Sequence, residues 1–321
     1  MASSATVSVI ITTFNYSDFV VNAIESVLAQ TRPADEVIVV DDGSTDSTPN
    51  LVAPYVARGV VRYIQQANQG PSVARNRGID ESSGELLAFL DADDTWLASK
   101  LELQIAWLKS HPDASMVSGQ MIWWHVPTDE RKLVAYESMT PGRMRREVTV
   151  RNVVGNPSMA LVRRSAIEAV GPYEPSLRWG QDWELFVRLS RVGDIGFVSE
   201  PVIVYRWHRS NLSHDRRLEQ LDMNQSISRW AIASFEPAWQ RPILRARSWS
   251  VFEYDRARIV SKLDVPRSRM IRHASLALLS WPIEDTIAKA QILGRLLVGE
   301  AIYQRASAGL RGKLGRARPV G

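Results

Sequence analysis

The sequence contains no cysteine among its 321 residues, which excludes disulfide bonds, thiolate metal sites and cysteine nucleophiles together. It also lacks any apolar run of the roughly 18 residues that a helix needs to cross a bilayer. Its first ten residues, MASSATVSVI, lack the charged start and the long apolar stretch of a signal peptide. We therefore expect a soluble, cytoplasmic protein, and the 45% hydrophobic content is sufficient for a true core.

Two common nucleotide-binding motifs are also absent. A dinucleotide-binding domain would carry G-x-G-x-x-G after its first strand, and a P-loop protein would carry G-x-x-x-x-G-K-[ST]. Neither motif occurs in the sequence. A nucleotide bound by this chain is therefore expected to be held by side chains and not by a glycine-rich loop.

The net charge of +4 conceals an uneven distribution. Residues 1–215 carry 20 Lys and Arg against 26 Asp and Glu, a net charge of −6, whereas residues 216–321 carry 19 against 9, a net charge of +10. This division predicts an acidic catalytic body followed by a basic, mainly helical C-terminal extension that could meet an anionic surface.

The first third of the chain alternates between strand and helix patterns. Its runs rich in β-branched residues are VSVIITTF, EVIVVDD, VVRYI and ELLAFLD. Helical patterns follow at residues 19–31 and 72–81, with Pro71 suited to a first helical position and Asp46 to the N-cap of a further helix. This order predicts an α/β fold with a mostly parallel, Rossmann-like sheet flanked by helices. Residues 127–151 are polar and charged, and we interpret them as a mobile loop.

Polar residues follow the first two predicted strands directly. In open α/β sheets ligands bind beyond the carboxyl ends of the strands, so Thr13 and Asn15 after the first strand and Asp42 after the second are candidate ligand contacts. The Asp42 carboxylate could accept a hydrogen bond from a base N–H or a ribose hydroxyl. Alternatively, Asp41, Asp42 and Gly43 only form a turn.

Three carboxylates, Asp91, Asp93 and Asp94, end the fourth predicted strand in the sequence FLDADDT. Like charges this close repel, which indicates that a cation belongs among them. On an extended chain Asp91 and Asp93 would point to the same side about 7 Å apart, and their hard oxygen ligands favour Mg²⁺ or Mn²⁺. We assign Asp94 the separate role of N-cap for the following helix.

Four segments, VSVIITTFN, EVIVVDDGSTDST, NQGPSVARNRGI and ELLAFLDADDTWL, together resemble family 2 glycosyltransferases of the GT-A fold over about residues 6–210. The resemblance implies a nucleotide half at about residues 1–110 and an acceptor half at about 111–215, while the shift in composition near residue 215 sets the start of the basic extension at 216–321. For the acidic cluster the resemblance implies metal ligation or ribose contact for Asp91 and metal ligation for Asp93. It also implies base contact for Asp42 and contact near the base and phosphates for Arg75, while Thr13 and Asn15 would line the nucleotide pocket.

Two downstream segments extend the resemblance. RWGQDWELFVRLSRVG is similar to the family's acceptor-side helix, which implies that Asp182 is the catalytic base, although Gln181 stands where many members have Glu. The alternative is that Asp182 only caps that helix. YRWHRSNLS is similar to a segment that returns to the active site, which makes His208 a candidate third metal ligand and would favour Mn²⁺ over Mg²⁺. Otherwise His208 is an exposed or hydrogen-bonded residue without a metal, and Arg206 or Arg209 contacts the diphosphate.

The implied reaction is inverting transfer of a sugar from a UDP- or dTDP-type nucleotide sugar, with Mn²⁺ or Mg²⁺, to a hydroxyl of a glycan or lipid-linked acceptor in envelope or surface polysaccharide synthesis. A nucleotidyltransferase is the nearest alternative enzyme, but it normally carries a basic, Gly-rich loop where this chain reads TTFNYSDF. A non-catalytic binder of anionic surfaces is the alternative from another class, and we expect no nucleic-acid binding. The basic tail at residues 311–321 predicts peripheral contact with the inner face of an anionic membrane, unless it is only a solvated tail.

Overall fold

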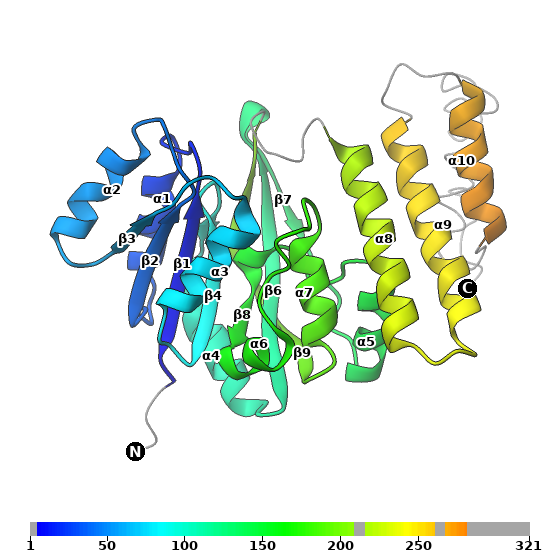
Figure 1. The fold of residues 1–321 in the computed structure, drawn as a ribbon, viewed down its shortest axis with the longest axis horizontal. Helices are drawn as coiled ribbons and strands as arrows, with labels where there is room; N and C mark the ends of the chain where they lie inside the picture. The colour runs from blue at the N-terminus through cyan, green and yellow to red at the C-terminus, as the bar shows by residue number, and fades with distance from the viewer. Residues whose placement is uncertain (1–4, 209–215, 261–266, 281–321) are drawn as a thin grey trace, which may run out of the picture. The chain divides into compact units, whose positions relative to one another are not determined.

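The computed structural model describes residues 5–208, 216–260 and 267–280 (Figure 1). The chain divides into two compact units, residues 1–214 and 215–321. Within these described ranges, no helix combines the length and the apolar character needed to cross a membrane.

The described residues of the first unit form one mixed sheet with the strand order β3-β2-β1-β4-β8-β6-β9-β5, and β7 pairs with β6. The strands are β1 (Val7–Thr13), β2 (Glu36–Asp41), β3 (Arg62–Gln65), β4 (Leu86–Asp91), β5 (Thr95–Trp96), β6 (Ala114–His125), β7 (Glu130–Val134), β8 (Leu161–Arg163) and β9 (Asp194–Trp207). The first four are parallel neighbours, as predicted. Beyond β4 the pairing is mixed, because β8 is antiparallel to both β4 and β6, while β6 and β9 are parallel.

Helices surround this sheet in the order that the sequence pattern predicts for its first half (Figure 1). Those of the first unit are α1 (Val20–Leu28), α2 (Thr48–Ala57), α3 (Pro71–Glu81), α4 (Lys100–Ser110), α5 (Pro141–Val150), α6 (Arg164–Val170) and α7 (Gln181–Leu189), with short 3₁₀ turns η1 (Val126–Thr128) and η2 (Pro157–Met159). The second unit contains α8 (Arg217–Phe235), α9 (Arg241–Val260) and α10 (Arg267–Ser280), and α9 packs against both α8 and α10.

The close packing of α3 on β1 determines where Arg75, one of the candidate site residues, lies. All seven residues of β1 are buried, as expected for a strand covered on both faces. A Cβ built on Gly78 of α3 would lie 2.3 Å from Cγ2 of Ile10, so only glycine lets the helix approach the strand this closely. Arg75, three residues earlier on α3, is fixed in position by the same contact.

Two sequence predictions about this unit are wrong. Residues 127–151 are not a mobile loop, because they contain β7, which pairs with β6, and α5, which buries Met144 and Val148. Their polar composition is typical of a loop, but here it reflects an exposed strand, since four of the five β7 residues are exposed. Asp94 is not an N-cap either, because β5 follows it and α4 begins only at Lys100 after its cap Ser99.

Of the two predictions about helix starts, the structure confirms Pro71 and places Asp46 one residue before the N-cap. Pro71 is the first residue of α3, as predicted. The N-cap of α2 is Ser47, but the neighbouring Asp46 carboxylate accepts a hydrogen bond from the amide of Thr48 at 2.9 Å. Asp46 thus supplies the bond of a cap from one position earlier.

Candidate functional site

The carboxyl ends of β1, β2 and β4 lie together, because β1 pairs with both of the other strands. In this register Thr12 lies opposite Asp91, and Thr13 lies opposite Asp41. The sheet therefore gathers the predicted ligand contacts of three separate sequence segments at one edge. Arg75 reaches the same edge from α3.

The Asp42 carboxylate organises the loop that leads into α3. Its Oδ1 accepts hydrogen bonds from the Gln66 side chain at 2.8 Å and from the Gln69 amide at 2.9 Å, and its Oδ2 accepts from the Gly70 amide at 2.8 Å. A carboxylate has about four acceptor positions, so roughly one is left for a ligand. Contact with a base stays a prediction, but the structural role is plain.

Asp41 belongs to the turn that was the alternative interpretation. Its Oδ1 accepts from the Ser44 amide at 2.7 Å, its Oδ2 accepts from the Tyr63 hydroxyl, and Gly43 adopts a φ of +87° between them. Burial, followed by the hydrogen bond to Asp41, raises the pKa of Tyr63. Asp41 thus fixes the turn that holds Asp42 in place.

Thr13 and Asn15 occupy the end of β1. The Thr13 hydroxyl is buried and has no hydrogen-bond partner within the described ranges, so it is a polar group still to be satisfied. Asn15 adopts a left-handed φ of 54°, and its Oδ1 accepts from the Thr45 amide at 2.8 Å. Asn15 therefore joins the end of β1 to the loop after β2.

A buried ion pair links α3 to the end of β4. The Arg75 guanidinium contacts Asp91 Oδ1 at 2.6 Å and lies 5.3 Å from the ring centroid of Tyr173. Arg75 is only 6% exposed. A charge this deeply buried needs its partner, so the pair fixes both side chains at the strand ends.

The predicted catalytic base lies in the same electrostatic neighbourhood. Burial raises the pKa of Asp182, the nearby Arg75 guanidinium lowers it, and the Asp91 carboxylate raises it further. Burial and the Asp182 charge likewise raise the pKa of Tyr136 to about 12. Burial is also the largest cause of the raised pKa of Tyr173, to which Asp182 contributes. Residues from α3, β4 and α7 therefore converge on one charged cluster, which we call the Arg75–Asp91–Asp182 cluster.

The position of Asp182 argues against a simple capping role. The N-cap of α7 is Gly180, with a φ of +71°, and Asp182 is the second helical residue. Its carboxylate also accepts a hydrogen bond from the Trp183 amide, which stabilises the helix start. Glu184, the next acid, is held by Arg188 through two contacts of 2.7 Å and is poorly placed to act as a base.

The predicted metal ligands lie near one another but do not form a compact set. Asp93 Oδ2 is 3.4 Å from His208 Nε2, and the His208 ring stacks on Phe19 at 4.5 Å. Asp91 instead faces Arg75. The chain turns at this point, since the Asp94 amide donates to the Asp91 carbonyl at 2.9 Å, so the extended geometry that we assumed is wrong. The parts of the chain that the structure describes contain no group of three or more acidic or His side chains close enough to hold a metal ion.

The donor chemistry nevertheless fits a divalent cation. Arg75 and Thr12 both contact Asp91 through Oδ1, so Oδ2 faces no hydrogen-bond donor from the described residues. Tyr16 is a neighbour that the sequence did not single out, and burial, followed by the Asp93 and Asp91 charges, raises its pKa strongly. Two carboxylates and an imidazole are ligands that suit Mn²⁺.

Asp94, which we had assigned as a cap, is a buried anchor for the turn. Its carboxylate accepts from the Asn156 side chain at 3.2 Å and from the Arg206 amide at 3.3 Å. Burial raises its pKa well above the usual range, and the charges of Asp93 and Asp91 add to this effect. Asp94 therefore ties the acidic turn to β9, which leads to His208. Arg209, the alternative phosphate contact, lies outside the described residues.

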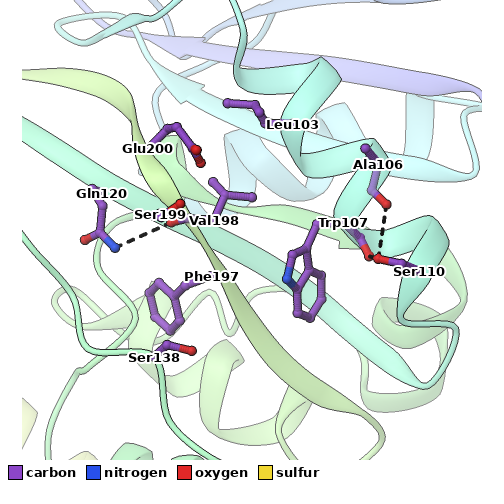
Figure 2. Close-up of a pocket in the computed structure, with 10 residues that line it drawn as sticks. All are labelled: Leu103, Ala106, Trp107, Ser110, Gln120, Ser138, Phe197, Val198, Ser199 and Glu200. Atoms are coloured by element: carbon purple, nitrogen blue, oxygen red, sulfur yellow. Dashed lines mark hydrogen bonds between the residues drawn. The ribbon is translucent and has the colours of Figure 1, made fainter.

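A pocket of about 550 Å³ lies elsewhere in this unit, between α4 and β9 (Figure 2). Figure 2 shows the Trp107 ring beside β9, where a Cβ on Gly196 would come within 1.9 Å of it. The Gln120 amide at its edge donates to the Val198 carbonyl at 3.4 Å. None of the predicted site residues lines this pocket, so we keep it apart from the Arg75–Asp91–Asp182 cluster.

Comparison with known proteins establishes the family. The family profile described as Glycosyl transferase family 2 matches residues 8–171, more than half of the chain. The chain therefore belongs to glycosyl transferase family 2, which confirms the resemblance seen in its motifs.

Individual relatives differ in how much they share with this chain. TuaG of Bacillus subtilis, a putative teichuronic acid biosynthesis glycosyltransferase, is 30% identical over 216 residues, which cover 65% of this chain and 82% of that protein. The uncharacterized glycosyltransferase alr2836 of Nostoc sp. is 32% identical over 64% of this chain and 66% of its own length. An uncharacterized glycosyltransferase of Rickettsia bellii is 43% identical over 33% of this chain, which matches only 16% of that longer protein.

Solved structures confirm the GT-A fold. A crystal structure of S. aureus TarS has a TM-score of 0.63 at 18% identity and covers 93% of this chain and 91% of its own. The mannosyltransferase PcManGT from Pyrobaculum calidifontis, solved in complex with GDP-Man and Mn²⁺, has a TM-score of 0.62 at 19% identity and covers 96% of this chain and 84% of its own. At these identities the likeness concerns the fold alone.

Proposed function

We propose that the chain is an inverting glycosyltransferase that moves a sugar from a UDP- or dTDP-type nucleotide sugar to an acceptor hydroxyl. The observation that carries this proposal is the Arg75–Asp91–Asp182 cluster, which puts a basic group for phosphates beside an acidic group for proton removal. Family membership supports the reaction class. TarS has been solved with UDP and with UDP-GlcNAc, which supports a nucleotide-sugar donor.

In the proposed reaction, a carboxylate oxygen of Asp182 takes the proton of the acceptor hydroxyl as that oxygen bonds to the anomeric carbon. The bond from this carbon to the diphosphate breaks on the opposite face, and its electron pair leaves with the diphosphate. Because burial raises the pKa of Asp182, it is a stronger base than an ordinary carboxylate. Arg75 lies within reach of the strand-end edge to hold the phosphates.

Asp91, Asp93 and His208 are the residues that would hold a divalent cation, Mn²⁺ or Mg²⁺. When bound there, the cation supplies neutralisation of the charge on the diphosphate. The Mn²⁺ in the structure of PcManGT supports this assignment. Thr13 and Asn15 would line the nucleotide pocket, and the last acceptor position of Asp42 would take a base N–H.

The acceptor is proposed to be a glycan or lipid-linked hydroxyl in cell-envelope or surface polysaccharide synthesis, which the similarity to TuaG, a putative teichuronic acid biosynthesis glycosyltransferase, supports. The transferase occupies residues 1–215 in this proposal, which agrees with the division of the chain after residue 214. The basic residues 216–321 would then carry any contact with the inner face of a membrane. Residues 311–321, on which the membrane prediction rests, lie outside the described residues.

Calorimetry with UDP in the presence and absence of Mn²⁺ tests the proposal on wild-type protein and on Asp93→Ala. We expect Mn²⁺ to promote UDP binding in the wild type and not in the variant, because the variant lacks a carboxylate that would hold the cation. Asp113→Ala, which removes an equally charged, exposed side chain before β6, serves as the matched control. Transfer at full rate in chelator-treated protein would refute the metal assignment and leave Arg75 to hold the phosphates alone.

A further inference from the structure

A pocket of about 350 Å³ lies between α8 and α9 within the second unit. Its lining residues are Gln225, Arg229, Ile232, Arg245, Ser248 and Trp249. Those of α8 are spaced i, i+4 and i+7, and those of α9 are spaced i, i+3 and i+4, so each set lies on one helix face. Two facing helix stripes therefore build the pocket.

Within the part of the second unit that the structure describes, no ion pair compensates the positive charge of this pocket. Arg229 and Arg245 form no ion pair with any described residue. Four acids of α8 and α9 are paired with other residues: Glu219 with Arg216, Asp222 with Arg256, Asp255 with Arg258 and Glu253 with His273. Two like charges lining one pocket attract an anion.

The pocket also offers a buried donor and an aromatic wall. Gln225 is 7% exposed, and its side-chain nitrogen has no hydrogen-bond partner within the described ranges. A buried donor left unsatisfied is costly, so an acceptor oxygen would stabilise it. The Arg229 guanidinium lies 5.7 Å from the ring centroid of Trp249, which keeps the indole beside the charge. Ile232 supplies a buried apolar surface.

We propose that this pocket binds a phosphate group attached to an apolar moiety. Guanidinium groups and an amide N–H suit phosphate oxygens, whereas Trp249 and Ile232 suit the apolar part. The volume is that of a site for a small organic molecule and far exceeds that of a bare ion. The phosphate can come from the headgroup of an anionic lipid or from a soluble compound, and the same residues recognise both. This site is independent of the sugar-transfer proposal, because none of its residues belongs to the Arg75–Asp91–Asp182 cluster.

The test uses the full chain and two probes. Inorganic phosphate is titrated by calorimetry, and vesicles of phosphatidylcholine with phosphatidylglycerol are sedimented with the protein. We expect Arg229→Ala and Arg245→Ala each to weaken binding about tenfold or more, since each removes a charge-assisted hydrogen bond. The affinity of Arg245→Lys, which keeps the charge but loses the planar guanidinium, should lie between those of the alanine variants and that of the wild type. Arg258→Ala is the matched control, because it removes one exposed arginine of α9 that does not line the pocket.

Each outcome decides the proposal. Phosphate binding that the two pocket variants lose and the control keeps supports the site with a soluble ligand. Vesicle binding with that same pattern, without binding of inorganic phosphate, supports the site with a lipid ligand. Equal loss in Arg258→Ala indicates general charge attraction and overturns the proposal, as does the absence of binding to both probes. Melting curves and calorimetry with UDP and Mn²⁺ on every variant separate loss of the site from loss of the fold.

Discussion

Asp182 shows at the level of one residue how activity and stability compete. Burial raises its pKa above the ordinary value, and Arg75 opposes this only in part. The folded protein therefore holds the Asp182 proton more tightly than the unfolded chain does. Stability falls as the pH rises from the ordinary carboxyl pKa through the raised one, and it stays lower above that window. The fold is thus less stable with Asp182, the proposed base, in its ionised form than in its protonated form.

Replacing Asp182 by Asn separates these two effects. The amide cannot take a proton, so the transfer rate should fall about 10²- to 10⁴-fold. The amide also carries no charge, while its oxygen can still accept from the Trp183 amide, so the melting temperature at neutral pH should stay equal or rise. Rate assays and thermal melts measure the two quantities. A lower melting temperature, with transfer within about fivefold of wild type, would make Asp182 a helix-stabilising residue only.

The rate of transfer should depend on pH through the same group. A protonated Asp182 cannot accept a proton, so kcat should decline as the pH is lowered, with a midpoint above the ordinary carboxyl value of about 4. A pH profile of kcat at saturating donor and acceptor measures this. The residual rate of Asp182→Asn should show no such decline. A midpoint at or below the ordinary value would contradict the raised pKa.

At the level of elements, the contact between α3 and β1 controls where Arg75 lies. Gly78→Ala would put a methyl group 2.3 Å from Cγ2 of Ile10, so the helix must move outward. We expect a loss of about 1–3 kcal/mol in the free energy of unfolding, and weaker UDP binding because Arg75 shifts with its helix. Gly142→Ala in α5 is the control, since its Cβ meets no atom within 4 Å. That variant should be neutral or more stable in denaturant melts, and equal losses in both variants would contradict the packing argument.

The elements that the sequence predicted share one physical property. β1, β2 and β4 are covered on both faces, so their apolar, β-branched runs stand out without knowledge of the fold. β7 and α5 were missed because their stability comes from tertiary pairing, which a polar composition conceals. Asp94 was missed for a similar reason, since its partners Asn156 and Arg206 are distant in the sequence.

For the whole molecule, the order of the motifs predicted the fold and the neighbourhood of the site, but not its contacts. Spacing along the chain can place Asp91 at a strand end, yet it cannot show that Arg75 pairs with it or that Tyr173 lies beside both. Of the site residues that the sequence analysis did not name, Tyr16 was the easiest to find, because it lies just after the first strand in TTFNYSDF. Tyr136 offered none, because it lies in the stretch predicted to be a loop.

Under the proposed function, the pairing of Arg75 with Asp91 predicts that nucleotide and cation bind cooperatively. A diphosphate that draws Arg75 away leaves the Asp91 carboxylate without its counter-ion, and a cation that takes Asp91 releases the guanidinium. Either ligand alone therefore leaves one of the two side chains without a counter-ion, whereas the diphosphate and the cation together neutralise both Arg75 and Asp91. We expect Mn²⁺ to lower the Kd of UDP and UDP to lower the Kd of Mn²⁺ by the same factor, which reciprocal titrations measure. Asp91→Asn should abolish this synergy, and equal affinities with and without the second ligand in the wild type would show that the pair does not open.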